Sequence, residues 1–115
     1  MKINILKNFC IDIHEYKHDA GWLVSTGIPE ELLDRNINIK LEYWAFDKNF
    51  DCHEKTQLIT IKASFFLDEM LKDLIEQVRV IMEKDDCGLY FIDHRFLESL
   101  ELDTDTLVAT TLWGS

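Results

Sequence analysis

Long apolar runs, glycine and proline are all scarce in this sequence of 115 residues, and each shortage excludes a class of protein. No stretch approaches the roughly 18 consecutive apolar residues of a membrane-spanning helix, and the start lacks the continuous apolar segment of a signal peptide. Four glycines leave little material for a phosphate-cradling loop, and no P-loop, nucleophile-elbow, H-E-x-x-H or EF-hand pattern occurs. We therefore expect neither membrane insertion nor secretion.

Cysteine is also sparse. Cys10, Cys52 and Cys87 are odd in number, widely separated and never arranged as C-x-x-C. Such a set does not form the disulfide framework of a small secreted domain. The pattern indicates reduced thiols and a location in the cytoplasm.

Basic residues are outnumbered by acidic ones, with 12 Lys and Arg against 22 Asp and Glu and a formal net charge of -10. A surface of this sign repels phosphate backbones and anionic lipid headgroups, and it attracts basic proteins. We expect no direct binding of nucleic acid or membrane, and a basic protein as the partner.

Apolar residues make up 47% of the chain, which is enough for a folded core and predicts one domain spanning residues 1–115. Alternation of apolar and polar residues predicts a strand over 3–13, where Lys7 indicates a bulge, a bend or a division into two short strands. A short strand is expected at 22–26, and Pro29 stands at the first position of a short helix.

The middle of the chain gives the clearest patterns. Strict alternation over 37–46 and again over 57–63 predicts an antiparallel hairpin with a long loop. Apolar residues at helical spacing then predict an amphipathic helix over about 65–84, with Ser64 as its N-cap. The remaining elements are expected to be a strand at 89–92, a helical turn at 94–100 and a last strand at 106–113.

The order of these elements favours a segregated α+β fold. We expect a mostly antiparallel sheet of about five to six strands, with the long helix packed on it and one or two short helices.

Three groups of residues were considered as sites of chemistry. Cys10, His14 and His18 stand four residues apart, a metal-ligand spacing on a helix, but in a strand that separation spans roughly 13 Å. Cys52 and His53 are neighbours in the sequence, so in a strand their side chains point to opposite faces. Acidic neighbours also raise the pKa of a thiol. The triplet 93–95 offers an acid and a base without a shared site. We therefore expect no catalytic residue, metal or cofactor, and no enzyme.

Acidic residues are concentrated between positions 83 and 105, among aliphatic and aromatic residues that mark folded chain. Such a cluster is typical either of an ordinary solvated surface or of an acidic docking face for a basic protein. An exposed tryptophan, among them Trp22, would add an apolar anchor. The predicted partner-binding residues are Asp85, Asp86, Asp93, Glu98, Glu101, Asp103 and Asp105, with Trp44 and Trp113.

In size, charge, α+β pattern and lack of catalytic motifs, the whole chain resembles the immunity proteins of bacterial contact-dependent growth inhibition and related polymorphic toxin systems. The resemblance implies an inhibitor that neutralises a cognate toxin, typically a nuclease, by covering its basic active-site face. Two alternatives stay open: a nucleic-acid mimic that blocks a DNA-binding or defence protein, and a small enzyme or metal- or ligand-binding domain. A homo-oligomer is also possible, because exposed strand edges can pair.

Overall fold

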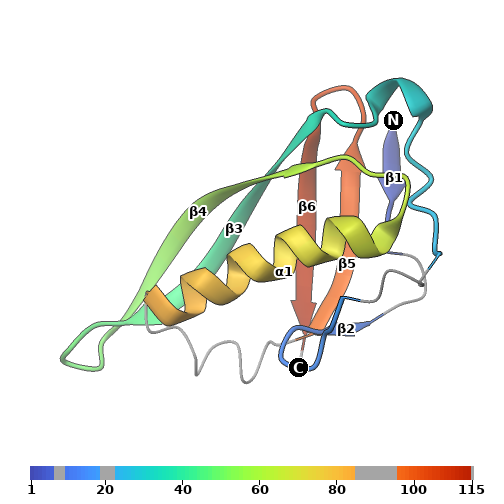
Figure 1. Ribbon diagram of the computed structural model, residues 1–115. Coiled ribbons are helices and arrows are strands. Elements are labelled where there is room, and N and C mark those ends of the chain that lie inside the picture. Colours follow the sequence, from blue (N-terminus) through green and yellow to red (C-terminus); the bar gives the residue numbers. More distant parts are fainter. Residues whose placement is uncertain (7–9, 19–22, 85–95, 115) are drawn as a thin grey trace.

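A six-stranded mixed sheet with one long helix packed on it forms the protein in the computed structural model, which describes residues 1–6, 10–18, 23–84 and 96–114 (Figure 1). No helix in these ranges is both long enough and apolar enough to cross a lipid bilayer. The elements are β1 (Lys2–Asn4), β2 (Ile11–Asp12), a 3-10 helix (Glu30–Leu32), β3 (Asn36–Phe46), β4 (Cys52–Lys62), α1 (Leu67–Lys84), β5 (Phe96–Asp103) and β6 (Val108–Gly114).

The strands lie in the order β1-β5-β6-β3-β4, and β2 pairs with β5 beside this path. All pairings are antiparallel except that of β3 with β6, which is parallel and holds only two pairs in register, Asn38 with Val108 and Ile39 with Ala109. Beyond these pairs β3 and β6 diverge, so the β3–β4 hairpin leans away from the β5–β6 hairpin (Figure 1). The expected α+β class is confirmed.

The core lies between α1 and one face of the sheet. Alternate residues of β3 are buried because a strand turns successive side chains to opposite faces, and they meet a helical stripe of buried residues from α1. Each fully buried large apolar side chain contributes roughly 1.5–3 kcal/mol to folding. The principal contributors are Ile37, Ile39, Leu41, Tyr43, Leu67, Met70, Leu71, Leu74, Ile75 and Val78.

The expected helical turn at 94–100 is wrong in its described part, because Phe96 begins β5. The register between β5 and β6 shifts between Leu97 and Ser99, which leaves one extra residue, Glu98, as a β-bulge. The bulge places the buried Leu97 and Leu100 three positions apart, a spacing that imitates a helix in the sequence.

Other boundaries differ in smaller ways. The first predicted strand is divided into β1 and β2, one of the three expected outcomes. In the described part of 22–26 the predicted strand is reduced to one isolated bridge, between Ser25 and Phe66. Pro29 precedes the 3-10 helix, whose first residue is Glu30. The helix α1 begins at Leu67, so the prediction of Ser64 as its N-cap is wrong. Ser64 instead accepts a hydrogen bond from the Phe66 N–H in the turn before the helix. The strand predicted at 89–92 lies outside the described residues.

Candidate functional site on the open face of the sheet

The face of the sheet opposite α1 presents a row of exposed side chains. On β3 these are the residues that alternate with the buried ones, and Trp44 among them is 42% exposed. On β6 they include Val108 and Leu112, and Leu112 is 59% exposed. We call this surface the open face. Its exposed large apolar side chains are typical of a recognition surface when they lie together.

A groove of about 500 Å³ lies on this face where β3 and β6 diverge. Because the parallel register ends at Ile39, the strands separate beyond it, and side chains of β3, β4 and β6 border the space between them. The groove combines an aromatic ring, a leucine and charged groups. Its lining includes Lys40, Glu42, Trp44, Glu54, Thr110 and Leu112.

A second hollow, of about 140 Å³, continues the open face across β6 toward β1. It shares Val108 and Thr110 with the main groove and adds Glu101, Asp103 and Lys2. The two hollows together are lined by four carboxylates and two lysines, so negative charge exceeds positive charge on this surface.

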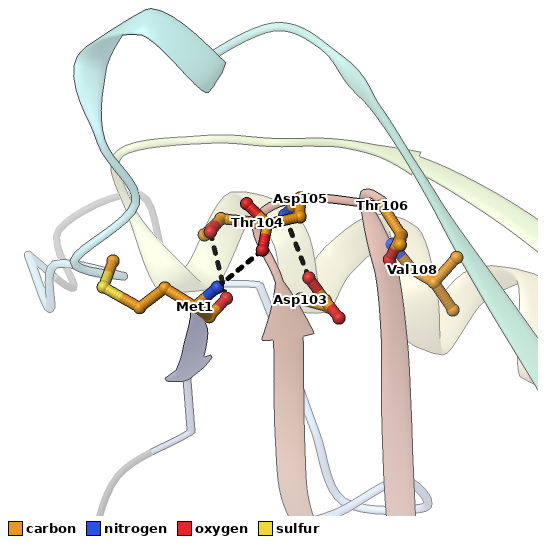
Figure 2. A network of polar contacts seen from close by, with 6 residues as sticks. All are labelled: Met1, Asp103, Thr104, Asp105, Thr106 and Val108. Carbon is orange, nitrogen blue, oxygen red and sulfur yellow. Dashed lines mark hydrogen bonds and ion pairs between the residues drawn. The ribbon is translucent and has the colours of Figure 1, made fainter.

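The turn between β5 and β6 fixes two of the predicted acidic residues (Figure 2). The Met1 ammonium lies 2.9 Å from Asp105 Oδ2, and the Thr104 hydroxyl donates to the Met1 carbonyl at 2.9 Å. Asp103 Oδ1 accepts the N–H of Asp105 at 2.9 Å. This backbone donor, followed by that of Thr106, lowers the pKa of the Asp103 carboxyl, whereas Asp105 raises the pKa of the Met1 amino group.

Of the four predicted acidic residues in the described part of the chain, three lie together and one lies apart. Glu101 and Asp103 lie on the open face, and Asp105 lies in the turn beside them. Glu98 is at the other end of β5, where its carboxylate occupies the space that a Cβ atom at position 114 would need. Asp85, Asp86 and Asp93 lie outside the described residues.

The two tryptophans proposed as anchors occupy different surroundings. Trp44 lies in the groove on the open face. Trp113 is partly buried against the core and also lines the groove, and its indole N–H donates to Thr111 Oγ1 at 3.0 Å. Trp22 lies outside the described residues. Sequence reasoning missed Val108 and Leu112, although their alternation with Ala109 in the predicted last strand was a signal for an exposed apolar row.

A second polar cluster joins the turn after β2 to the first turn of α1. The buried Asp68 carboxylate, 2% exposed, accepts the Tyr16 hydroxyl through Oδ1 and lies 2.5 Å from His18 Nδ1 through Oδ2. His18 Nε2 lies 3.7 Å from Glu69 Oε1. Burial, and then the hydrogen bond to Asp68, raise the pKa of the Tyr16 hydroxyl.

Within the described ranges, His18, Asp68 and Glu69 are the one group of three or more potential metal ligands, and Cys10 and His14 are not part of it. Its side chains bind one another, and the Tyr16 hydroxyl also binds the Asp68 main-chain carbonyl at 3.1 Å. This arrangement anchors the segment before residue 19 to α1.

The pair of Cys52 and His53 is separated by the pleat of β4. His53 Nε2 lies 2.8 Å from Asp47 Oδ2 in the hairpin loop, and Cys52 is exposed at the start of the strand. The contact with His53, followed by the backbone donors of Asp51 and Asn49, lowers the pKa of Asp47. This histidine therefore stabilises the loop.

Comparisons with protein-family models, with curated proteins and with solved structures found no match to this chain.

Proposed function

We propose that this chain is an acidic protein-binding inhibitor of the immunity-protein type, which neutralises a cognate toxin by laying the open face of its sheet over the toxin's basic surface. One observation carries the proposal: the groove at Trp44 is an exposed apolar site within a surface on which carboxylates outnumber lysines.

The apolar centre of the open face supplies the expected binding energy. Trp44 and Leu112 line the groove, where a partner side chain could displace water from both. Aromatic anchors in such positions commonly dominate an interface, and truncating one to alanine typically costs about 2 kcal/mol or more. Trp44 is therefore the residue on which we expect affinity to depend most.

The charged residues around the apolar centre of the open face are expected to orient the partner and to speed its association. Lys40 lies 3.6 Å from Glu42 and Lys2 lies 3.7 Å from Glu101, and both pairs are exposed, so each contributes little to folding. Lysine and arginine side chains of a partner can compete for these carboxylates. A nuclease needs a cationic cleft to hold phosphates, and an anionic protein is attracted to such a cleft over a long range at low salt.

The proposal is tested by affinity capture from the native cell with the wild-type chain and with Trp44→Ala, followed by reconstitution with the purified partner. We expect one basic partner that the variant fails to retain, and whose toxic activity the wild-type chain blocks. Capture of several unrelated DNA-binding proteins would instead indicate nucleic-acid mimicry and would refute the immunity function.

Association kinetics with the purified partner then separate the two contributions. Glu42→Lys combined with Glu101→Lys is expected to slow association at low salt, whereas Trp44→Ala accelerates dissociation. The matched control is Glu30→Lys combined with Glu83→Lys, which changes the net charge equally at exposed positions outside both hollows. Equal slowing by the two double variants would show that the open face has no special part.

A further inference from the structure

The strand β4 forms one edge of the sheet, and in the described part of the chain it pairs with β3 alone. It is 11 residues long, contains no proline and keeps an unbroken register with β3. All residues from 52 to 58 are exposed. Proteins commonly shorten, bend or cover such an edge, because its free backbone groups can pair with another strand.

The hydrogen bonds of the neighbouring strand show which backbone groups of β4 face outward. The Ala63 N–H donates to the Arg35 carbonyl at 2.8 Å, so the odd-numbered positions of this hairpin bond across it. The Asn38 N–H donates instead to the Leu107 carbonyl at 3.0 Å, on the β6 side. Because successive residues of a strand turn their backbone groups to opposite sides, the even-numbered residues of β4 direct their N–H and carbonyl groups to the free edge.

A side chain of the helix confirms this direction at one position. Gln77 Nε2 donates to the Thr60 carbonyl at 3.1 Å, reaching it from α1 rather than from β3. The outward backbone groups are thus those of Glu54, Thr56, Leu58, Thr60 and Lys62.

The side chains of these same five residues form a self-complementary row on the open face. Leu58, at the centre, is 68% exposed. A twofold axis placed at Leu58 would relate β4 to an antiparallel β4 of a second copy. It would set Leu58 opposite Leu58, Thr56 opposite Thr60 and Glu54 opposite Lys62. In this register every outward N–H would meet an outward carbonyl, and both ion pairs could form. The Thr60 carbonyl, which already accepts from Gln77, would accept the Thr56 N–H of the second copy through its other lone pair. An axis at Gln57 would place Glu54 opposite Thr60 and lose both ion pairs.

Next to this edge, the helix α1 carries a row of residues with the same order of acid, apolar residue and base. A groove of about 430 Å³ between β4 and α1 is lined by Leu58 together with Glu76, Val80 and Lys84, and Val80 is 61% exposed. These three helical residues follow one another at four-residue intervals as acid, apolar and base, in the same order as Glu54, Leu58 and Lys62 in β4. Because this row also runs from acid through apolar residue to base, the α1 row of an antiparallel second copy would present the opposite order of charges.

We propose that this chain forms a twofold dimer with a second copy of itself through the edge of β4, centred on Leu58, which joins the two sheets into one. The dimer does not depend on the proposed inhibitory function. Trp44 lies in the groove toward β6, away from Leu58 at the centre of the dimer interface, and the residue that the two sites share is Glu54.

The first test is sedimentation of the purified chain over a range of concentrations at physiological salt, where repulsion between the two acidic copies is screened beyond about 8 Å. We expect the mass to rise from 13.6 kDa toward twice that value as concentration increases. Leu58→Lys is expected to keep the protein monomeric, because it places two lysines opposite each other at the centre. A wild-type protein that remains monomeric at millimolar concentration would overturn the proposal.

The register is tested by exchanging charges. Glu54→Lys and Lys62→Glu should each weaken the dimer by about tenfold, since each replaces two attractive pairs with two repulsive ones. The double variant should restore wild-type affinity. Within one chain Glu54 is opposite Trp44 and Lys62 is opposite Asn36, so the two charges meet only between copies. If neither single change weakens the dimer, or if the double variant does not restore its affinity, this interface is overturned.

Amide hydrogen exchange gives a readout that a purely structural role of β4 would not produce. On dilution, the N–H groups of Thr56 and Leu58 should exchange faster, whereas those of Gln57 and Ile59, already bonded to β3, should change little. Glu83→Lys, outside the groove beside β4, is the control and should leave both the mass and the exchange pattern unchanged. Concentration-dependent protection at the odd-numbered residues alone would contradict the proposal.

Discussion

Removal of the Tyr16 hydroxyl tests whether the cluster at the start of α1 holds the N-terminal segment in place. In Tyr16→Phe, the buried Asp68 carboxylate loses one hydrogen-bond donor while it keeps His18. Water cannot readily replace that donor, because Asp68 is almost fully buried. A hydrogen bond to a charged group contributes about 1.5–3 kcal/mol, and the partial exposure of Tyr16 places the expected loss at about 1–2 kcal/mol.

The loss is measured by urea unfolding and by thermal unfolding followed by circular dichroism. For a domain of this size, the midpoint of thermal unfolding should fall by roughly 5 °C for each kcal/mol of stability lost. Thr110→Val, which removes an exposed hydroxyl from the open face, is the matched control and should change stability by less than about 0.5 kcal/mol. A Tyr16→Phe protein as stable as the wild type would refute the anchoring role.

The same substitution has a signature in alkali. The folded state raises the pKa of Tyr16 above its ordinary value of 10.0, so this group stabilises the fold fully below pH 10.0 and loses that contribution as the pH rises further. The free energy of unfolding of the wild type should therefore fall more steeply than that of Tyr16→Phe above pH 10.0. Identical slopes, or a phenolate absorbance difference that titrates at the ordinary pKa, would contradict the assigned hydrogen bond.

Three further changes test other contacts. Arg79→Met removes hydrogen bonds of the guanidinium to the Ile13 and Tyr16 carbonyls and should cost about 2 kcal/mol in urea unfolding; a neutral effect would show that these bonds add nothing. Phe50 has a φ of 61°, which strains the backbone of a residue with a side chain, and it is 82% exposed. Phe50→Gly relieves this strain and should raise the free energy of unfolding by about 0.5 kcal/mol; a loss of stability would show that the backbone is not strained there. Because the pKa of Asp103 is lowered, Asp103→Asn should be less stable than wild type at neutral pH. The difference should shrink as the pH falls below 3.8 and vanish only below the lower pKa of the folded state; a difference that persists there would exclude the charge as its cause.

Much of the fold was predictable from periodicity, because β3 and α1 bury one side each and their sequences repeat with periods of two and about 3.6. The error at β5 has a physical source: the bulge at Glu98 changes the spacing of buried leucines to one that a helix also produces. The parallel pairing of β3 with β6 was not predictable, since the contact joins segments far apart in the chain and leaves no local pattern.

The candidate site was predictable only in part. Trp44 was one of the tryptophans proposed as an anchor, and it lies among the exposed residues that alternate with the buried ones of β3. The groove beside it was not, because it exists only where β3 and β6 part. The acidic cluster was defined by sequence position, whereas the bulge and the β5–β6 turn distribute Glu98, Glu101 and Asp105 to different surroundings.

The short contact between β3 and β6 has a consequence for the order of folding. The β3–β4 and β5–β6 hairpins each close a local loop, which costs little chain entropy. Joining the two hairpins requires ordering the long intervening chain, and it forms only two pairs in register between β3 and β6. The free energy that stabilises this step therefore comes mainly from burying apolar side chains of the sheet under α1. We therefore expect the hairpins to form early and the joint between them to close last, as the helix docks.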